Sequence, residues 1–540
     1  MSDSFHPPPF TTLPVEVLTN ILGRLDLLSL LRCSSVCKLL HDVVDGTPRI
    51  QYKMELEIAG LTDRPTVKMS VTERISTLSS HQAFFKSLKA GMTAWRTQFD
   101  EVVAYHGDLA VVCLLPREDS VGEPISQLEY ESLKLCRVLP ASMDAGVSPH
   151  WWNIKPKRAF TGVWMDPGQD LMVLTCIESV KNETVFAVSS SLKSVLTPLD
   201  GSGTLFNRNN SLQVLSISSG ERLSDGDISI PLPGGSLRSL RWRVARCCIW
   251  DDMVAITLWQ LPPFYPRTTL ILGWRDGDIR ARLNSPQFTS DFRFLSRSTF
   301  ILGHRPTKSF HTIIAIRLFS FDPDISQDVA SSQHPPKPRL IAIFHLPTLS
   351  LPSIKLHISV IGMEERGCHS SPESGRIFEA SRDKGVLAIS IHSAEDDLCA
   401  TLFIDPSVFR SFIPTQEDIA SIPWSAWGPQ NTRLLEFNHH NLIRCYGTRV
   451  LLSGRILDFN TLDVMRDMHT RRLKEVDSVP NGLCHGKDNP SYYRKGGLFR
   501  DDTIMTMLPY REQLYEARYS GVASASLRKV WPGEDWIMSS

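Results

Sequence analysis

The 540-residue sequence has no long apolar run and no surplus of charge of either sign. No stretch approaches the roughly 20 apolar residues that a membrane-spanning helix needs, so the sequence predicts no membrane partner. Lysine plus arginine number 58, and so do aspartate plus glutamate. This balance argues against binding to nucleic acid or another polyanion, although it leaves a local basic patch open. Residues 1–10 have neither the basic start nor the apolar centre of a signal peptide, and we expect a short flexible tail there.

The eleven cysteines follow no recognisable pattern. Their number is odd and no C-x-x-C pair occurs, which favours reduced thiols in the cytosol or nucleus over disulfides or a zinc site. The sequence also lacks H-E-x-x-H, G-x-x-x-x-G-K-[ST], G-x-S-x-G and a G-x-G-x-x-G after a strand. His439-His440 and Cys484-His485 have no further ligands at zinc spacing. The sequence therefore predicts no metal, no cofactor and no catalytic residues.

The chain does have a stretch from Thr11 to Met54 that is rich in apolar residues at helical spacing. Apolar residues at spacings of three and four predict a first helix from Val15 to Leu25. Asp26 is placed to cap a second helix, Ser34 or Ser35 to start a third that ends at Asp45-Gly46, and Thr47-Pro48 to open a fourth. So small a unit cannot bury this much leucine by itself. It either packs on its own chain or offers a face to a partner.

The order of residues in this stretch resembles the F-box. The residues that carry the resemblance are Leu13, Pro14, Glu16, Leu18, Ile21, Leu22, Leu25, Leu30, Leu31, Val36, Cys37 and Lys38, with Asp26 between them. Many F-boxes have Trp two residues after the lysine, where this chain has Leu40. The resemblance implies an F-box domain over residues 11–60 in which these twelve residues bind a Skp-type adaptor. Leu13, Pro14, Leu18, Ile21 and Leu25 are the expected apolar anchors.

Residues 61–100 are expected to form a helical connector. Ser70 is placed to cap a helix in which Val71, Ile75, Leu78 and Phe85 recur roughly on one face and which ends near Gly91. Such a helix either fixes the N-terminal bundle against the rest of the chain or covers the edge of its own domain.

After Asp100 the pattern changes to short β-branched and aromatic runs between polar turns, which predicts an all-β domain over residues 101–540. The clearest strands are Leu109–Leu115, Leu171–Ile177, Thr184–Ser189, Leu212–Ile217, Arg241–Trp250, Val254–Trp259, Thr269–Trp274, Thr299–Gly303, Thr312–Phe321, Leu340–Leu346, Val386–Ile391 and Val450–Leu452. Asp251-Asp252 is expected to form a hairpin turn. Trp424 and Trp427 either line a recognition surface or wedge a loop into the core, and we expect the core.

A strand–turn–strand pattern recurs weakly in this domain, in segments that begin at Gln213, Leu270 and Gly454. Hairpins of this kind occur in propeller blades, so the sequence predicts a β-propeller, with one blade over about Thr268 to His304. Regular Trp-Asp repeat endings are missing. The whole chain resembles fungal F-box proteins in which a propeller-like β domain follows the F-box. Phrases that carry this likeness are Gln51–Leu56, Trp274–Gly277, Pro423–Pro429, Leu457–Asn460 and Leu508–Arg511.

The resemblance implies a substrate-receptor subunit of an SCF-type ubiquitin ligase. In that role the F-box binds the adaptor, the adaptor joins cullin and RING subunits, and the β domain holds an unknown target protein without performing catalysis itself. Two alternatives stay open. The chain could be a non-ligase scaffold that binds the adaptor without cullin. It could also be a propeller hydrolase, because carboxylates distant in sequence can converge in a central channel.

Overall fold

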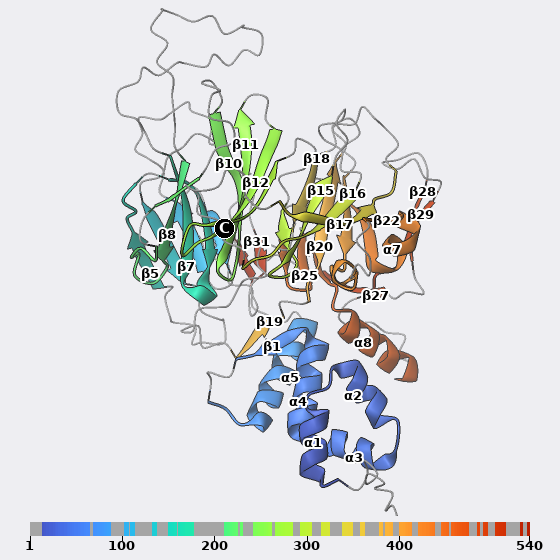
Figure 1. Cartoon of the computed structure of the whole chain (residues 1–540). Helices are drawn as coiled ribbons and strands as arrows, with labels where there is room; N and C mark the ends of the chain where they lie inside the picture. Colours follow the sequence, from blue (N-terminus) through green and yellow to red (C-terminus); the bar gives the residue numbers. More distant parts are fainter. Residues whose placement is uncertain are drawn as a thin grey trace, which may run out of the picture.

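A computed structural model describes residues 13–64, 68–87, 102–106, 109–113, 132–137, 150–158, 160–177, 210–224, 227–230, 241–261, 265–284, 292–304, 315–324, 337–348, 357–361, 377–381, 384–392, 399–412, 419–437, 444–452, 455–474, 483–485, 490–494, 503–514, 530–532 and 537–539. Figure 1 shows a group of N-terminal helices below a large β-rich body. The sequence-based division into a small helical region and a large β region is therefore confirmed. The predicted strand Thr184–Ser189 and the pair His439-His440 lie outside the described residues.

Four short helices form the N-terminal bundle: α1 (Val15–Leu22), α2 (Leu27–Ser34), α3 (Lys38–Gly46) and α4 (Pro48–Ala59). The prediction that Ser34 or Ser35 starts the third helix is wrong. Both hydroxyls donate to carbonyls of the preceding turn, at Leu31 and Arg32, so these serines finish α2 instead of capping α3. Gly60, with φ of 70°, ends α4 in the left-handed conformation that glycine adopts most easily.

A short strand and a longer helix follow the bundle: β1 (Leu61–Asp63) and α5 (Val71–Ser87). Ser70 caps α5 as expected, because its Oγ accepts from the Glu73 N–H at 3.3 Å while the Glu73 carboxylate accepts from the Ser70 N–H at 2.8 Å. This reciprocal pair is a capping box. The predicted end of the helix near Gly91 lies outside the described residues.

The described strands of the body form six sheets of four or five strands. Most strands pair with the strand that comes next in the sequence. The first three are β2 (Val102–His106), β3 (Leu109–Cys113), β4 (Leu133–Arg137) and β5 (His150–Ile154); β6 (Phe160–Asp166), β7 (Leu171–Ile177), β8 (Asn210–Ser216) and β9 (Ile228–Ser229); and β10 (Arg241–Trp250), β11 (Met253–Leu261), β12 (Tyr265–Gly273) and β13 (Ile279–Asn284). Each of these three is an antiparallel meander, in which every strand pairs with the next one along the chain.

The remaining three sheets keep this plan with small additions. They are β14 (Arg293–Phe294), β15 (Thr299–His304), β16 (Ala315–Ser320) and β17 (Arg339–His345) with β22 (Ala420–Ile422); β18 (His357–Ile361), β20 (Leu387–His392), β21 (Cys399–Ile404) and β23 (Thr432–Phe437); and β24 (Arg444–Tyr446), β25 (Arg449–Leu452), β26 (Arg455–Asp458) and β30 (Tyr510–Leu514) with β27 (Leu483–His485). Two-stranded pairs are β1 with β19 (Phe378–Ala380), β28 (Ser491–Arg494) with β29 (Thr503–Thr506), and β31 (Val530–Pro532) with β32 (Ile537–Ser539). Among the described strands, only β22 joins its neighbour in parallel.

Each of the four middle sheets shares one hydrophobic core with the sheet before it and another with the sheet after it. Strand β7 shows how: Met172 and Leu174 pack with the β2–β5 sheet, whereas Leu171 and Val173 pack with the β10–β13 sheet. Successive side chains of a strand point to opposite faces, so a strand that is apolar throughout must be covered on both sides. Five such shared cores connect the six sheets in sequence order.

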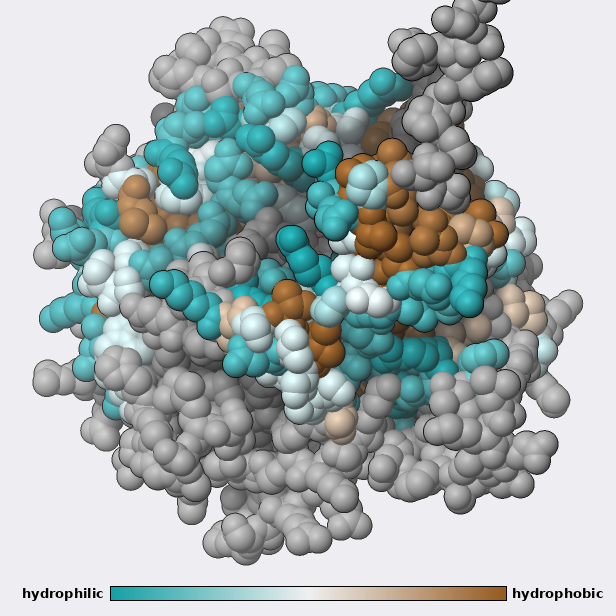
Figure 2. All heavy atoms as spheres, turned by 90° about the horizontal axis from the view of Figure 1, so that it is seen from below, coloured by the Kyte–Doolittle hydropathy of each residue, from teal (hydrophilic) through white to brown (hydrophobic). Residues whose placement is uncertain are grey.

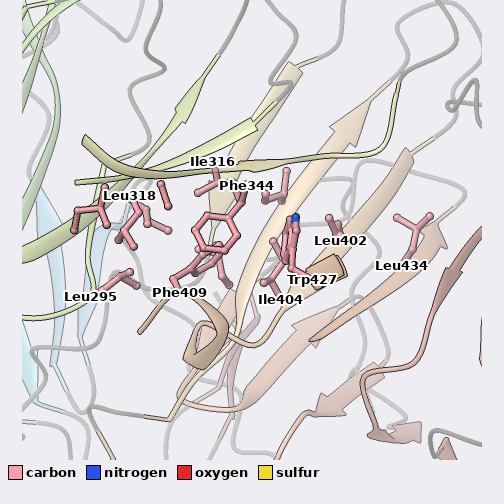
Figure 3. Packing of buried hydrophobic residues seen from close by; sticks show 14 of the residues in the cluster. Leu295, Ile316, Leu318, Phe344, Leu402, Ile404, Phe409, Trp427 and Leu434 are labelled. Carbon is pink, nitrogen blue, oxygen red and sulfur yellow. The ribbon is translucent and has the colours of Figure 1, made fainter. Parts of the chain in front are cut away.

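The core between the β14–β17 and β18–β23 sheets contains Trp427, on α7 (Trp424–Asn431). Its ring is 3% exposed, its indole N–H donates to the His345 carbonyl at 3.0 Å, and Phe344 lies edge-on to it. Figure 3 shows this ring among Phe344, Phe409 and Ile404. A short helix, α6 (Ser407–Arg410), supplies Phe409. The expectation that Trp427 belongs to the core is confirmed, and Trp424 packs against the same core.

Two parts of the repeat prediction are wrong. The proposed blade over Thr268–His304 joins β12 and β13 of one sheet to β14 and β15 of the next. The third copy does not form a hairpin, because helix α8 (Thr461–Lys474) follows β26 directly. The Asn460 side chain accepts from the Asp463 N–H at 3.4 Å and so supports the first turn of α8. The Asp251 turn is confirmed, with φ of 50° between β10 and β11.

Candidate functional site: an outer apolar face on the N-terminal bundle

The twelve residues of the F-box pattern divide into an inner and an outer group. Leu18, Leu22 and Leu30 are at most 1% exposed and form the core of the bundle with Leu40, Val43, Val44 and Ile50. They cannot contact a partner without unfolding the bundle, so Leu18 is not a surface anchor. Leu13, Leu25 and Cys37 are half-buried against this core. The exposed members are Pro14, Glu16, Ile21, Leu31, Val36 and Lys38.

Seven large apolar side chains lie on the outside of α1, α2, α3 and the turn before α3. They are Val15 (51% exposed), Val17 (41%), Ile21 (38%), Leu28 (59%), Leu31 (45%), Val36 (73%) and Leu39 (37%), and we call them the outer apolar face. Figure 2 views the molecule from the side of the bundle and shows one large apolar patch and a few smaller, separate ones. Only four further described large apolar side chains reach this degree of exposure, namely Leu223, Ile419, Met465 and Tyr492.

Four residues of this face, Val15, Val17, Leu28 and Leu39, were missing from the sequence-based set. The signal that could have found them is the two-sided character of the helices. In α2, Leu27 and Leu30 are buried while Leu28 and Leu31 are exposed. A surface helix normally has one apolar stripe, so apolar residues on the opposite side indicate a second contact surface.

The shape of the face is set by contacts beneath it. Lys53 of α4 donates from Nζ to the carbonyls of Gly23 (3.0 Å) and Leu25 (2.5 Å), and Glu57 accepts from the Leu27 N–H at 2.9 Å. These contacts fix the turn between α1 and α2. Asp26 caps α2 by accepting from the Ser29 N–H at 2.9 Å, and this bond lowers the pKa of its carboxyl.

A partner can bind such a face because its apolar side chains are exposed to water, and removing them from water is favourable. Contiguous apolar patches on soluble monomers are usually small, and larger ones mark interaction sites. Burying a valine or leucine side chain fully is worth roughly 1.5–3 kcal/mol. Several half-exposed side chains together can therefore support a stable complex, with Glu16 and Lys38 as exposed charges of opposite sign in the same region.

The rest of the described chain shows little that suggests chemistry. Among the described residues, no group of three His, Cys, Asp or Glu side chains is placed to hold a metal ion, and no helix is long and apolar enough to span a bilayer. Burial raises the pKa of the Cys176 thiol to about 12 and that of Cys247 well above its usual range. Both thiols therefore stay protonated and unreactive at neutral pH.

One open groove of about 530 Å³ lies at the strand ends of the β14–β17 sheet. Its lining combines Phe321 and Pro323 with Asp322, Lys337, Arg339 and the hydroxyls of Ser298 and Ser320. The carboxylate and the two cations have opposite signs, and the lining holds no histidine or cysteine. The groove offers hydrogen bonds but no pair of groups arranged for acid–base or nucleophilic catalysis.

Comparison with known proteins identifies the bundle. Residues 10–50 match the F-box-like family. This match covers α1, α2 and α3, which carry the outer apolar face. A comparison with curated proteins found no match. Two solved structures of Synechocystis apocarotenoid oxygenase variants are similar over part of the chain, at 8% and 6% identity and with TM-scores of 0.25 and 0.24. The alignments cover 64% and 55% of this chain and 60% and 55% of the oxygenase chains.

Proposed function

We propose that this protein is the substrate receptor of an SCF-type ubiquitin ligase. The F-box-like domain binds a Skp-type adaptor, the adaptor connects it to cullin and RING subunits, and the β domain holds a target protein. The chain contributes proximity and not bond chemistry, since holding the target beside the charged conjugating enzyme raises the effective concentration of its lysines. This role belongs in the cytosol or nucleus, where the scattered cysteines remain reduced.

The outer apolar face is the observation that carries the proposal. It occupies the part of the chain that matches the F-box-like family, and it holds seven of the eleven exposed large apolar side chains of the described residues. Exposed apolar residues gathered in one part of a protein indicate an interaction site. Among the twelve residues of the pattern, we propose Pro14, Ile21, Leu31 and Val36 as direct contacts, with Leu13 and Leu25 at the margin. Leu18, Leu22 and Leu30 support these contacts from within the core.

We further propose that the β domain is a propeller with six main blades. Six sheets in sequence order, each sharing a core with its neighbours, are the arrangement that radial stacking of blades produces. A propeller suits a receptor because it is a rigid platform with binding loops at its ends.

A pull-down with a purified Skp-type adaptor tests the function. Leu31→Asp places a charge in the outer apolar face at a site that is already 45% exposed, so the fold tolerates it. Leu223→Asp is the matched control, because Leu223 is 41% exposed but lies in the β domain. We expect the first variant to lose adaptor binding at least about tenfold and the control to bind normally, since an unpaired charge buried in an interface costs more than 1.4 kcal/mol. Equal binding by both variants and the unchanged chain would contradict the proposal.

A pull-down that detects cullin distinguishes the ligase receptor from the non-ligase scaffold. If the chain is a receptor, cullin and RING subunits assemble with it through the adaptor, and Leu31→Asp removes all of them together. A stable complex of chain and adaptor that excludes cullin would instead support the scaffold.

A further inference from the structure

We propose that β19 and α8 of the β domain hold the F-box-like domain in one fixed orientation, so that the two parts move as a single body. Three sets of contacts carry this inference, and they join the N-terminal helices to segments of the β domain more than 300 positions away in the sequence. Their consequence for ubiquitin transfer rests on the proposed function, whereas the docking itself does not.

The first set is a β-ladder between the two parts. Strand β1, directly after the bundle, pairs antiparallel with β19 of the body, with Thr62 opposite Glu379. The Arg64 N–H donates to the Ile377 carbonyl at 3.0 Å, and the Ser381 N–H donates to the Gly60 carbonyl at 2.9 Å. Backbone pairing fixes register and direction, so it is more restrictive than a side-chain contact alone.

Strand β19 also completes a hydrophobic core. Phe378 is 6% exposed and packs with Tyr52 and Leu56 of α4, Leu61 of β1 and Leu78 of α5. The helices thus form this core together with a ring that the β domain supplies. Separating the two parts would expose Phe378 and its neighbours to water, which opposes hinge motion.

The second set runs through α8. Arg511 of β30 is buried and pairs with Asp463 at 2.9 Å and Asp467 at 2.6 Å, both on α8. Arg466 of the same helix pairs with Glu55 of α4 at 2.7 Å and donates to Gln82 of α5 at 3.3 Å. Ion pairs therefore connect the β domain through α8 to α4, and a hydrogen bond from the same arginine reaches α5.

The third set holds the C-terminal end of α4. Asn460 donates from Nδ2 to the Ile58 carbonyl at 2.7 Å, and the Lys384 ammonium donates to the Glu57 carbonyl. Both carbonyls lie in the last turn of α4, where intrahelical donors run out, although the Glu57 carbonyl also accepts from the Gly60 N–H at 3.2 Å. A cation near them also complements the helix dipole. The ladder, α8 and these two caps hold β1, α4 and α5 at several separate points, which opposes rotation about any one of them.

The docking leaves α1 and α3 farthest from the β-rich body, with α2 between them and α8 (Figure 1). Figure 1 shows β1 and β19 at the junction, α8 beside the bundle, and α1 and α3 lowest. The helices α1 and α3, which carry part of the outer apolar face, are thus held at a distance from the sheets of the body and at a defined angle to them (Figure 1). In a ligase, the angle between the F-box-like domain and the β domain determines the position of a bound target relative to the conjugating enzyme.

Hydrogen exchange on the full chain tests the docking. The Arg64 and Ser381 amides report on the ladder between the parts, and the amides of α4 report on the bundle. The variant Arg466→Ala with Lys384→Ala removes two cross-domain contacts. Arg455→Ala is the matched control, because Arg455 pairs with Glu512 at 2.9 Å within the β domain.

We expect the Arg64 and Ser381 amides of the unchanged chain to be protected as strongly as α4, and the double variant to accelerate their exchange at least about threefold. The control should leave them unchanged. Adaptor binding by the double variant should stay within about twofold, because α1, α2 and α3 are not altered. Weak protection of these two amides in the unchanged chain, or no acceleration in the double variant, would overturn the inference. If the unchanged chain binds no adaptor, the proposed function fails while the exchange result still decides the docking.

Discussion

At the scale of single residues, the bundle shows the limit of a periodic pattern. Leu18 and Val36 both belong to the F-box pattern, yet Leu18 is 0% and Val36 73% exposed. The spacing of apolar residues predicts helices because residues three and four positions apart lie on the same side of a helix and can be buried together. It cannot decide which apolar side faces inward when both sides are apolar, because that depends on how α1 packs on α3 and α4.

Leu18 and Val36 should therefore respond differently to truncation. Leu18→Ala removes buried methyl groups and leaves a cavity, so we expect it to lower the free energy of unfolding of the bundle by about 2–5 kcal/mol. Val36→Ala should change this free energy by less than about 0.5 kcal/mol but weaken adaptor binding. Hydrogen exchange of the α1 amides measures the first effect and titration with the adaptor the second. A destabilising Val36→Ala that leaves adaptor binding intact would reverse the two assignments.

At the scale of elements, the sequence was informative where neighbours in the chain decide the structure. The bounds of β10 and the cap of α5 were predicted correctly, because alternation and capping are local. The start of α3 was not predicted correctly, and neither was the helix that follows β26 in place of a hairpin. Ser34 and Ser35 bond backward to α2, and α8 is held by Arg511, a residue far along the chain. No local pattern reveals that partner.

The capping box of α5 makes the first turn of this helix sensitive to acid. Hydrogen bonds from the Ser70 N–H and hydroxyl lower the pKa of Glu73. A carboxyl whose pKa is lower in the folded chain stabilises the fold above its unfolded pKa, near 4.3, and loses this effect as the pH falls through the folded pKa. We expect Ser70→Ala to raise the pKa of Glu73, because one of the two bonds is lost, and to speed exchange in the first turn of α5.

An NMR titration of the Glu73 carboxyl in the full chain checks this prediction. Ser80→Ala is the control, since the Ser80 hydroxyl bonds to the Ser76 carbonyl in the same helix and not to Glu73. A Glu73 pKa that is the same in both variants would show that the hydroxyl contributes nothing to the cap.

At the scale of the whole molecule, the sequence predicted the order of the parts but not the grouping of strands. Hairpin signals identify strands that pair across a short turn, as β12 and β13 do. They do not show where one sheet ends and the next begins, because that boundary depends on which faces share a core. The attachment of the bundle through β1 and β19 was invisible for the same reason, since the paired residues are more than 300 positions apart.

The serial arrangement of sheets makes a prediction from two adjacent residues of β7. Leu174 and Val173 are both fully buried, but Leu174 faces Leu133 and Leu135 of β4, whereas Val173 faces Val254 and Ile256 of β11. Leu174→Ala should leave a cavity toward β4, and Val173→Ala should leave one toward β11. Hydrogen exchange should then accelerate mainly in the β2–β5 sheet for the first variant and in the β10–β13 sheet for the second.

The contrast between the two variants is what distinguishes stacked sheets from one common core. If all sheets packed around a shared centre, both truncations would loosen the same set of strands. In a serial stack each sheet is stabilised by its immediate neighbours only, so a cavity on one face loosens first the sheet on that side. Truncation of Leu283, which is 6% exposed and faces the β14–β17 sheet, should extend the pattern by one step and accelerate exchange in β15 and β16. Identical exchange profiles for the three variants would contradict the serial arrangement.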